Sequence, residues 1–173
     1  MILPRRTHLA VLASIGLLIQ ASAIAGDVTM ANGAVRFSVP DSWVPIMQTQ
    51  GDPETQVFQV PDPSPAGAKT LSRVTVSVKQ AGNMAGYQSW MGQQTARARQ
   101  LTGYAPDAHR AATPNDYFYT AQETGAQFTY HERYAFSGSL AIQLRCVRPA
   151  TGDARWQASF DAGCDDVASH LPQ

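Results

Sequence analysis

Hydrophobic and polar residues alternate along several segments of the chain, as they do in strands that bury one face. In residues 73–79, valine occupies every second position between polar neighbours. Two glycine-containing turns, Thr124-Gly125 and Ser137-Gly138, separate three later segments, which must therefore run antiparallel. The predicted strands are residues 35–39, 56–60, 73–79, 117–122, 127–136 and 140–147.

The spacing of apolar residues changes to that of a helix in two places. From Met84 to Leu101 apolar residues recur every three or four positions, and Asn83 is a suitable N-cap. From Trp156 to Leu171 the same spacing follows Asp153, a second N-cap. Gly163 weakens the second pattern, and we expect it to kink or split that helix.

The order of these elements predicts the fold class. Several strands, a helix, three antiparallel strands and a final helix, without regular alternation of strand and helix, are typical of α+β proteins. We expect an antiparallel sheet of about six strands with two main helices packed on it. Residues 26–173 contain no internal repeat and no linker, so they predict a single domain of 173 − 25 = 148 residues.

The first 25 residues have the layout of a secretory signal peptide. Arg5 and Arg6 precede an apolar run from Leu9 to Ile19, and two overlapping Ala-x-Ala sites follow at 21–25. The run is shorter than the roughly 20 residues of a spanning helix. We expect residues 1–25 to be removed after Ala23 or Ala25, by the Sec or the Tat route, and the protein to be periplasmic or secreted.

Charge narrows the classes of partner. Without the two leader arginines, the chain has 13 − 2 = 11 basic and 13 acidic residues, with no basic stripe. This balance argues against nucleic acid as a partner, because nucleic-acid binding proteins cluster Lys and Arg on one face. No run of 18 apolar residues follows the leader, so we expect no membrane insertion after cleavage.

The chain has two cysteines, Cys146 and Cys164, which form either one disulfide or two unpaired buried thiols. Two cysteines in an exported chain indicate one disulfide. Cys146 shares a strand face with Ile142 and Leu144, and Cys164 lies on the apolar stripe of the last helix with Phe160. We therefore expect a Cys146–Cys164 bridge that joins the last helix to the last strand.

The chain resembles the PsbP-like superfamily in its motifs and in the order of its elements. The residues that carry the resemblance are Phe37-Ser38-Val39-Pro40-Asp41-Ser42-Trp43, a strand ending in Pro-x-x-Trp, then Arg73-Val74-Thr75-Val76 before a helix, and the aromatic hairpin strand 128–134. The resemblance covers most of residues 28–171. It implies an antiparallel sheet with packed helices. It does not imply one function, because members of the superfamily mostly bind proteins and share no catalytic residue to carry over.

No motif of catalysis or cofactor binding is present in the sequence. We find no nucleophile elbow, P-loop or dinucleotide fingerprint, and His109, His131 and His170 lack metal-site spacing. We therefore assign no catalytic residue, metal ligand or cofactor. His131 falls on the same side of its strand as Thr129 and Arg133, so we expect it at the surface.

The strand 128–136 carries the candidate binding residues. Tyr130, Glu132 and Tyr134 fall on one face of this strand, with Phe128 and Phe136. If a helix covers that face, Glu132 must pair with an arginine of a neighbouring strand or reach solvent. If the face is open at the Tyr130–Tyr134 end, as we expect, these residues form a tyrosine-rich contact site for another protein.

These observations favour an exported, non-catalytic domain that binds another protein. An immunity-type partner of a secreted effector is one concrete version of this function. An envelope small-molecule-binding module, with a pocket between sheet and helix, is the alternative. An enzyme with an unrecognised site is a third hypothesis.

Overall fold

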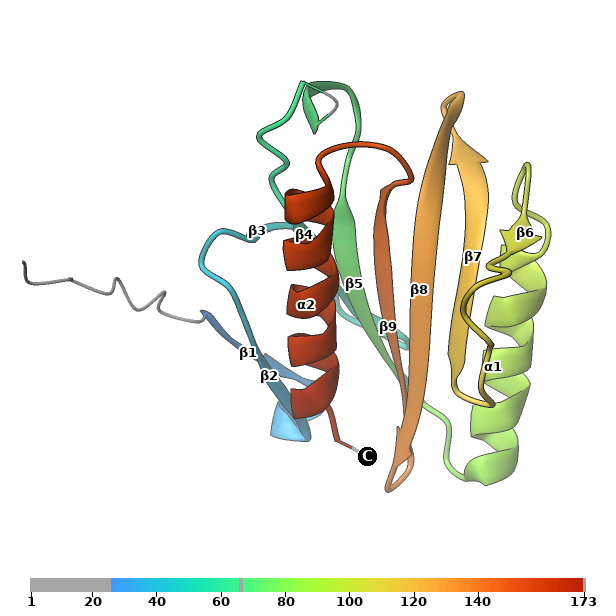
Figure 1. Cartoon of the computed structure of the whole chain (residues 1–173). Helices are drawn as coiled ribbons and strands as arrows, with labels where there is room; N and C mark the ends of the chain where they lie inside the picture. Colours follow the sequence, from blue (N-terminus) through green and yellow to red (C-terminus); the bar gives the residue numbers. More distant parts are fainter. Residues whose placement is uncertain (1–25, 66, 173) are drawn as a thin grey trace, which may run out of the picture.

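The structure, a computed structural model, describes residues 26–65 and 67–172 (Figure 1). The expected signal peptide at 1–25 lies outside the described residues. Seven strands form one sheet in the order β3-β4-β5-β9-β8-β7-β6, and every neighbouring pair is antiparallel. Its strands are β3 (Val44–Thr49), β4 (Glu54–Gln59), β5 (Arg73–Gln80), β6 (Ala105–Pro106), β7 (Asp116–Glu123), β8 (Ala126–Ser137) and β9 (Leu140–Pro149).

Two helices lie on opposite faces of this sheet (Figure 1). Helix α1 (Met84–Ala98) packs Tyr87 and Trp90 against Tyr134 of β8. Helix α2 (Ala154–His170) packs on the other face, because alternate residues of β9 point to opposite sides of the sheet. Ile142, Leu144 and Cys146 face α2 and belong to its core, whereas Ala141 belongs to the α1 core.

A second, two-stranded sheet completes the layer that contains α2. It consists of β1 (Gly26–Met30) and β2 (Val35–Val39), which are antiparallel. Phe37 of β2 and Met30 of β1 are buried in the same core as Phe160 of α2. One layer made of α2, β2 and β1 therefore covers one face of the large sheet.

The disulfide fixes α2 to β9. Cys146 and Cys164 are bonded, with Cα atoms 6.4 Å apart, and both side chains are buried. This is the arrangement that the sequence predicts, since each cysteine lies on the core-facing side of its element. Because structural disulfides persist in oxidising compartments, the bridge supports a location outside the cytoplasm.

The α+β class, the two helices and the six predicted strands are confirmed. Asn83 and Asp153 are the N-caps, accepting hydrogen bonds from the backbone N–H of Gly86 (3.0 Å) and Trp156 (2.7 Å). The number of strands is larger than the prediction, because β1, β3 and β6 have no clear alternation in the sequence.

Helix α2 is continuous, so the expected kink or split at Gly163 is wrong. A Cβ atom on Gly163 would lie 2.8 Å from Cζ2 of Trp43. Glycine therefore lets the helix backbone approach the indole ring, and its role is close packing, not helix termination.

Candidate functional site

The predicted contact residues on β8 are buried. Tyr130 is 4%, Glu132 0% and Tyr134 2% exposed. The expectation that this face is open at the Tyr130–Tyr134 end is wrong, because α1 packs over it and Trp90 lies edge-on to Tyr134, with ring centroids 6.1 Å apart. These tyrosines belong to the core and present no surface to a partner.

Glu132 is held by a closed set of donors beneath α1. The hydroxyls of Tyr119 and Tyr134 donate to its two carboxylate oxygens at 2.6 and 2.5 Å. Gln143 Nε2 donates at 3.2 Å, and Arg145 Nε donates at 2.7 Å. The arginine on a neighbouring strand that the sequence analysis required is therefore Arg145 of β9, in register with Glu132.

Burial and the Glu132 charge raise the pKa of both tyrosines that donate to it. Desolvation is the larger cause for Tyr119 and for Tyr134, and the nearby carboxylate adds to it. Both phenols therefore keep their protons and act as donors at neutral pH. A carboxylate with four donors is a satisfied structural group, which explains its burial without a catalytic role.

A second carboxylate, Glu123, lies on the same face at the end of β7. Arg73 donates to both its oxygens, at 3.0 and 2.5 Å, and the Tyr130 hydroxyl also donates to it. Although burial alone would raise the pKa of Glu123, the hydrogen bonds from Arg73 and Tyr130 hold it below its usual value. The polar atoms of this face are thus paired with one another.

His131 points to the opposite face of β8 and is not the surface residue that the alternation predicts. Its side chain is 16% exposed, its ring stacks on Phe118 with centroids 4.2 Å apart, and Nε2 lies 3.3 Å from Asp116 Oδ1. Burial lowers the pKa of His131, which outweighs the opposite effect of Asp116. His131 is therefore neutral at pH 7.

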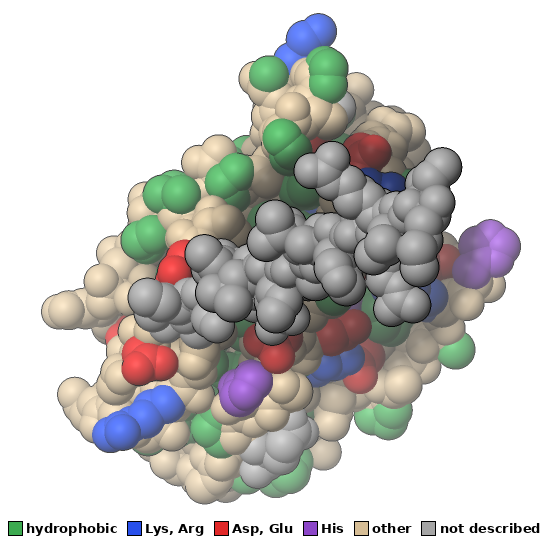
Figure 2. All heavy atoms as spheres, turned by 60° about the vertical axis from the view of Figure 1, so that its left-hand side comes forward, with side chains coloured by type: hydrophobic (Ala, Val, Ile, Leu, Met, Phe, Trp, Pro, Cys, Tyr) green, Lys and Arg blue, Asp and Glu red, His purple; other side chains and the backbone are tan. Residues whose placement is uncertain are grey.

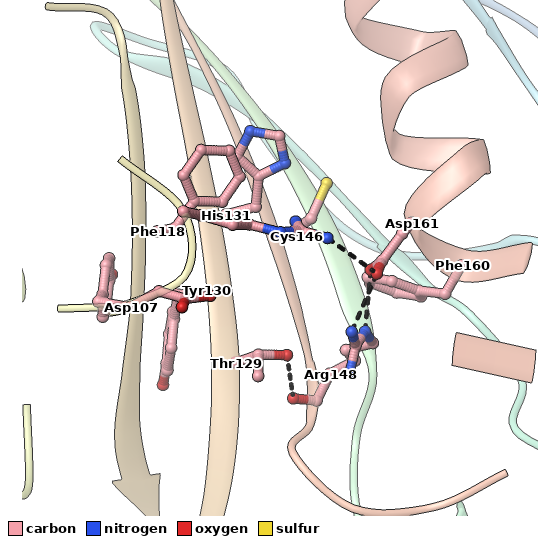
Figure 3. Close-up of a pocket in the computed structure, with 11 residues that line it drawn as sticks. Asp107, Phe118, Thr129, Tyr130, His131, Cys146, Arg148, Phe160 and Asp161 are labelled. Atoms are coloured by element: carbon pink, nitrogen blue, oxygen red, sulfur yellow. Dashed lines mark hydrogen bonds and ion pairs between the residues drawn. The ribbon is translucent and has the colours of Figure 1, made fainter. Parts of the chain in front are cut away.

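A small pocket lies beside His131, between the large sheet and α2 (Figure 3). Its volume is about 110 Å³. Arg148 donates to Asp161 of α2 through Nε and Nη2, both at 2.9 Å, so the strongest charges there neutralise each other. Sites for drug-sized ligands have volumes of about 300–1,000 Å³. This pocket is too small and too well paired internally to be the main candidate site.

The main candidate is a groove at the other end of the same face, with a volume of about 450 Å³. We call it the β1–β3 groove. Trp43 and Phe58, whose ring centroids are 6.4 Å apart, supply its aromatic surface. The residues that line it are Gly26, Asp27, Val28, Thr29, Val39, Pro40, Asp41, Trp43, Pro45, Gln48, Gln56 and Phe58.

Strand β3 also carries exposed apolar side chains, and the register of Val44 with Gln59 and of Met47 with Val57 places them on the other face of the sheet from the groove residues Pro45 and Phe58. Val44, Ile46 and Met47 are 47%, 44% and 50% exposed, and the six residues of β3 include no charge. Figure 2 turns this side of the molecule forward and shows hydrophobic side chains at its margin. β3 is also an edge strand of the large sheet, so its outer backbone is open to a partner.

The sequence predicts β2 and β4, which line part of this groove, but it does not predict β1 and β3, which form its two sides. The signal for β3 was available as an uncharged run, Val44-Pro45-Ile46-Met47, directly after the Pro-x-x-Trp motif. Among residues 26–65 and 67–172, no group of three or more His, Cys, Asp or Glu side chains could hold a metal ion. No helix in the same part of the chain is long and apolar enough to cross a membrane.

Comparison with known protein families and with curated protein sequences finds no match. Solved structures do match. LpqN of Mycobacterium tuberculosis, described as involved in cell envelope biogenesis, is 12% identical and has a TM-score of 0.53, with 86% of this chain and 89% of LpqN covered. The chain has the PsbP/Mog1-like fold.

Two further structures support this assignment of the fold. The Ran-binding protein Mog1p of Saccharomyces cerevisiae is 10% identical with a TM-score of 0.52, over 87% of this chain and 96% of Mog1p. A Bacteroides thetaiotaomicron protein is 15% identical with a TM-score of 0.51, over 85% of this chain, and the chain spans about half of its length, 47%. At these identities the similarity concerns the fold alone, and the resemblance to the PsbP-like superfamily is confirmed at that level.

Proposed function

We propose that this protein is an exported, non-catalytic domain that binds another protein through β3 and the β1–β3 groove. The observation that carries the proposal is the cluster of Val44, Ile46 and Met47, each more than 40% exposed on an uncharged edge strand. Contiguous apolar surface on a water-soluble domain usually marks an interface. The disulfide and the signal-like leader favour the periplasm or the outside of the cell as the place of binding.

Proteins of the same fold supply a general precedent. Mog1p is described as Ran-binding, and LpqN as involved in cell envelope biogenesis. An immunity-type partner of a secreted effector is a specific form of the proposal, because an exported binding domain lies in the compartment through which such an effector passes.

A small-molecule-binding module of the envelope is the second candidate function. The volume of the β1–β3 groove, about 450 Å³, falls within the range of ligand sites, and Trp43 and Phe58 give it an apolar surface. Addition of an envelope lipid extract to the purified protein, with tryptophan fluorescence as the readout, separates this candidate from the first. A saturable change that Phe58→Ala removes would favour the small-molecule function.

The protein-binding proposal is tested by photo-crosslinking in the native host. A photoreactive amino acid replaces Met47, which is 50% exposed on β3. Met84 is the matched control, since it is 49% exposed but lies at the start of α1 and lines no part of the groove. We expect a discrete crosslinked protein from position 47 and none from position 84. Equal crosslinking at both positions, or none at 47, would overturn the proposal.

A further inference from the structure

The layer that contains α2 ends in an unpaired strand. β1 pairs only with β2, and no backbone hydrogen bond from another described segment reaches its outer edge. A two-stranded sheet is marginal by itself, and a free strand edge is a template for pairing with another chain. The order across this layer is therefore α2, β2, β1 and then open space.

That open space is the β1–β3 groove, and the backbone of β1 forms its wall. Four consecutive residues, 26–29, line the groove, although successive side chains of a strand point to opposite faces. The strand consequently meets the groove edge-on, with its unpaired N–H and C=O groups.

The floor of the groove is a stretch of the large sheet with apolar and glutamine side chains. Pro45 of β3 is in register with Phe58 of β4, and Gln48 is in register with Gln56. All four residues line the groove, together with Trp43. A strand laid beside β1 would rest on this floor as β1 and β2 rest on the strands next to it, because stacked sheets pack face to face.

We propose that an extended segment of a partner protein adds to the outer edge of β1 as a third strand and places alternate apolar side chains on the floor formed by Pro45 and Phe58. This inference rests on the proposed function and names the kind of segment that is bound. Main-chain hydrogen bonds to β1 supply affinity, and the floor selects for side chains at every second position.

Charge specifies the segment further. Asp27 and Asp41 line the groove, and none of the described residues lining it is basic. Asp27 accepts only a hydrogen bond from the Ser38 hydroxyl at 3.3 Å, and the Asp41 carboxylate has no partner among the described residues. The bound segment therefore lacks acidic residues and carries a lysine or arginine that reaches Asp41.

The test uses hexapeptides with valine at alternate positions and blocked ends, added at millimolar concentration to the ¹⁵N-labelled protein without its leader. One peptide carries a lysine, and a second carries glutamate in its place. A third and a fourth are the lysine peptide with alternate amides N-methylated, on one edge in the third and on the other edge in the fourth. We expect the lysine peptide to shift the amide signals of residues 26–30 and to protect alternate amides among them, because every second N–H of β1 already points toward β2. We expect the glutamate peptide to lose binding. Of the two N-methylated peptides, the one whose methyl groups face β1 should also lose binding, whereas the one whose methyl groups face solvent should still bind.

Two variants examine the charge. Asp41→Asn should weaken the lysine peptide about two- to fivefold, as expected for an exposed ion pair. Asp166→Asn is the control, because Asp166 is 61% exposed near the end of α2 and does not line the groove. It should leave the affinity unchanged.

Each contrary outcome has a defined meaning. Equal binding of both N-methylated registers and the parent peptide, no binding of any peptide, or perturbation away from residues 26–30 would overturn strand addition. Concentration-dependent dimers that protect the same amides would identify the occupant as a second copy of this chain and would also overturn it. In any of these cases, a crosslinked protein at position 47 would still support the proposed protein-binding function. The absence of that crosslink would reject the function itself, whatever the peptides show.

Discussion

The aromatic face beneath α1 and the β1–β3 groove both rest on buried aromatic rings, since Trp43 and Phe58 are 6% and 3% exposed, but they differ in whether their polar groups are paired. Beneath α1, Tyr130 and Tyr134 are at most 4% exposed, and the carboxylate of Glu132 has four donors. In the groove, Asp41 has no partner among the described residues, and the outer edge of β1 has no backbone partner there.

This difference shows that tyrosine content is a poor guide to a binding surface. The tyrosines of β7 and β8 use their hydroxyls to satisfy buried carboxylates, which stabilises the core. The described residues that line the groove include no tyrosine. The outer backbone N–H and C=O groups of β1 and the Asp41 carboxylate are unpaired among the described residues, so a partner can form hydrogen bonds and an ion pair with them. Variants of the first region should therefore alter stability, and variants of the second should alter binding.

The largest effect is expected for Glu132→Ala. Its removal leaves the Arg145 guanidinium and two buried tyrosine hydroxyls without their acceptor, and breaking a buried pair costs about 3–5 kcal/mol. Chemical denaturation should show this loss. Glu123→Ala is the control, since the side chain of Glu123 is 28% exposed and its arginine is 23% exposed. An equal loss in both variants would contradict the closed nature of the face beneath α1.

The double variant Cys146→Ser/Cys164→Ser should follow in magnitude. The bridge spans 18 positions, and a loop of that length contributes about 3 kcal/mol by limiting the unfolded chain. We expect a lower melting temperature, with reduction of the native protein by dithiothreitol giving a similar decrease. If reduced and oxidised protein melted together, the disulfide would not stabilise α2 on β9.

How far the sequence predicted the fold depends on the burial of each strand. β5 and β9 alternate cleanly because one of their faces lies in the α2 core, and helix α2 was predicted from Phe160, Cys164 and their repeat. β3 was missed because all six of its side chains are exposed and leave no alternation. Strands without a clear alternation of apolar and polar residues are those whose side chains remain exposed. The candidate site includes such a strand and was therefore the least predictable region.

The sequence shows that a buried charge needs a partner, but it does not show which residue is that partner. The sequence demanded an arginine for Glu132 if its face was covered, but it could not choose Arg145, because that choice depends on the register between β8 and β9. It also could not place Gly163 against Trp43, which are far apart in the chain. Such contacts are set by tertiary packing and not by local pattern.

Gly163→Ala examines the junction of the two regions, because Trp43 belongs to the core and also lines the groove. The new Cβ would lie 2.8 Å from Trp43, and such overpacking costs about 1–3 kcal/mol. Gly92→Ala in α1 meets no atom within 4 Å and should instead stabilise by up to ~1 kcal/mol. Thermal melts of both variants should move in opposite directions; a shared direction would reject the close approach.

A smaller effect is expected from the titration of Glu123. Because its folded pKa is below the ordinary value of about 4.3, it stabilises the protein above that pH, and the contribution is lost as the pH falls through the lower folded pKa. Unfolding measured at pH 7 and at successively lower pH should show the difference between wild type and Glu123→Gln shrinking. A constant difference would mean that the Arg73–Glu123 pair does not depend on charge.

The smallest effect on stability is expected for a substitution on β3. Met47→Ser removes an exposed side chain from β3, so the free energy of unfolding should change by no more than about 0.5 kcal/mol. Met84→Ser removes an equally exposed methionine from α1 and should behave alike. Partner binding should distinguish the two, because only Met47 lies on β3, the proposed contact strand, and loss of capture at an unchanged melting temperature assigns its role to recognition. If Met47→Ser instead lowered the melting temperature and left capture intact, β3 would be a structural edge, and the contrast between a closed core face and an open binding groove would fail.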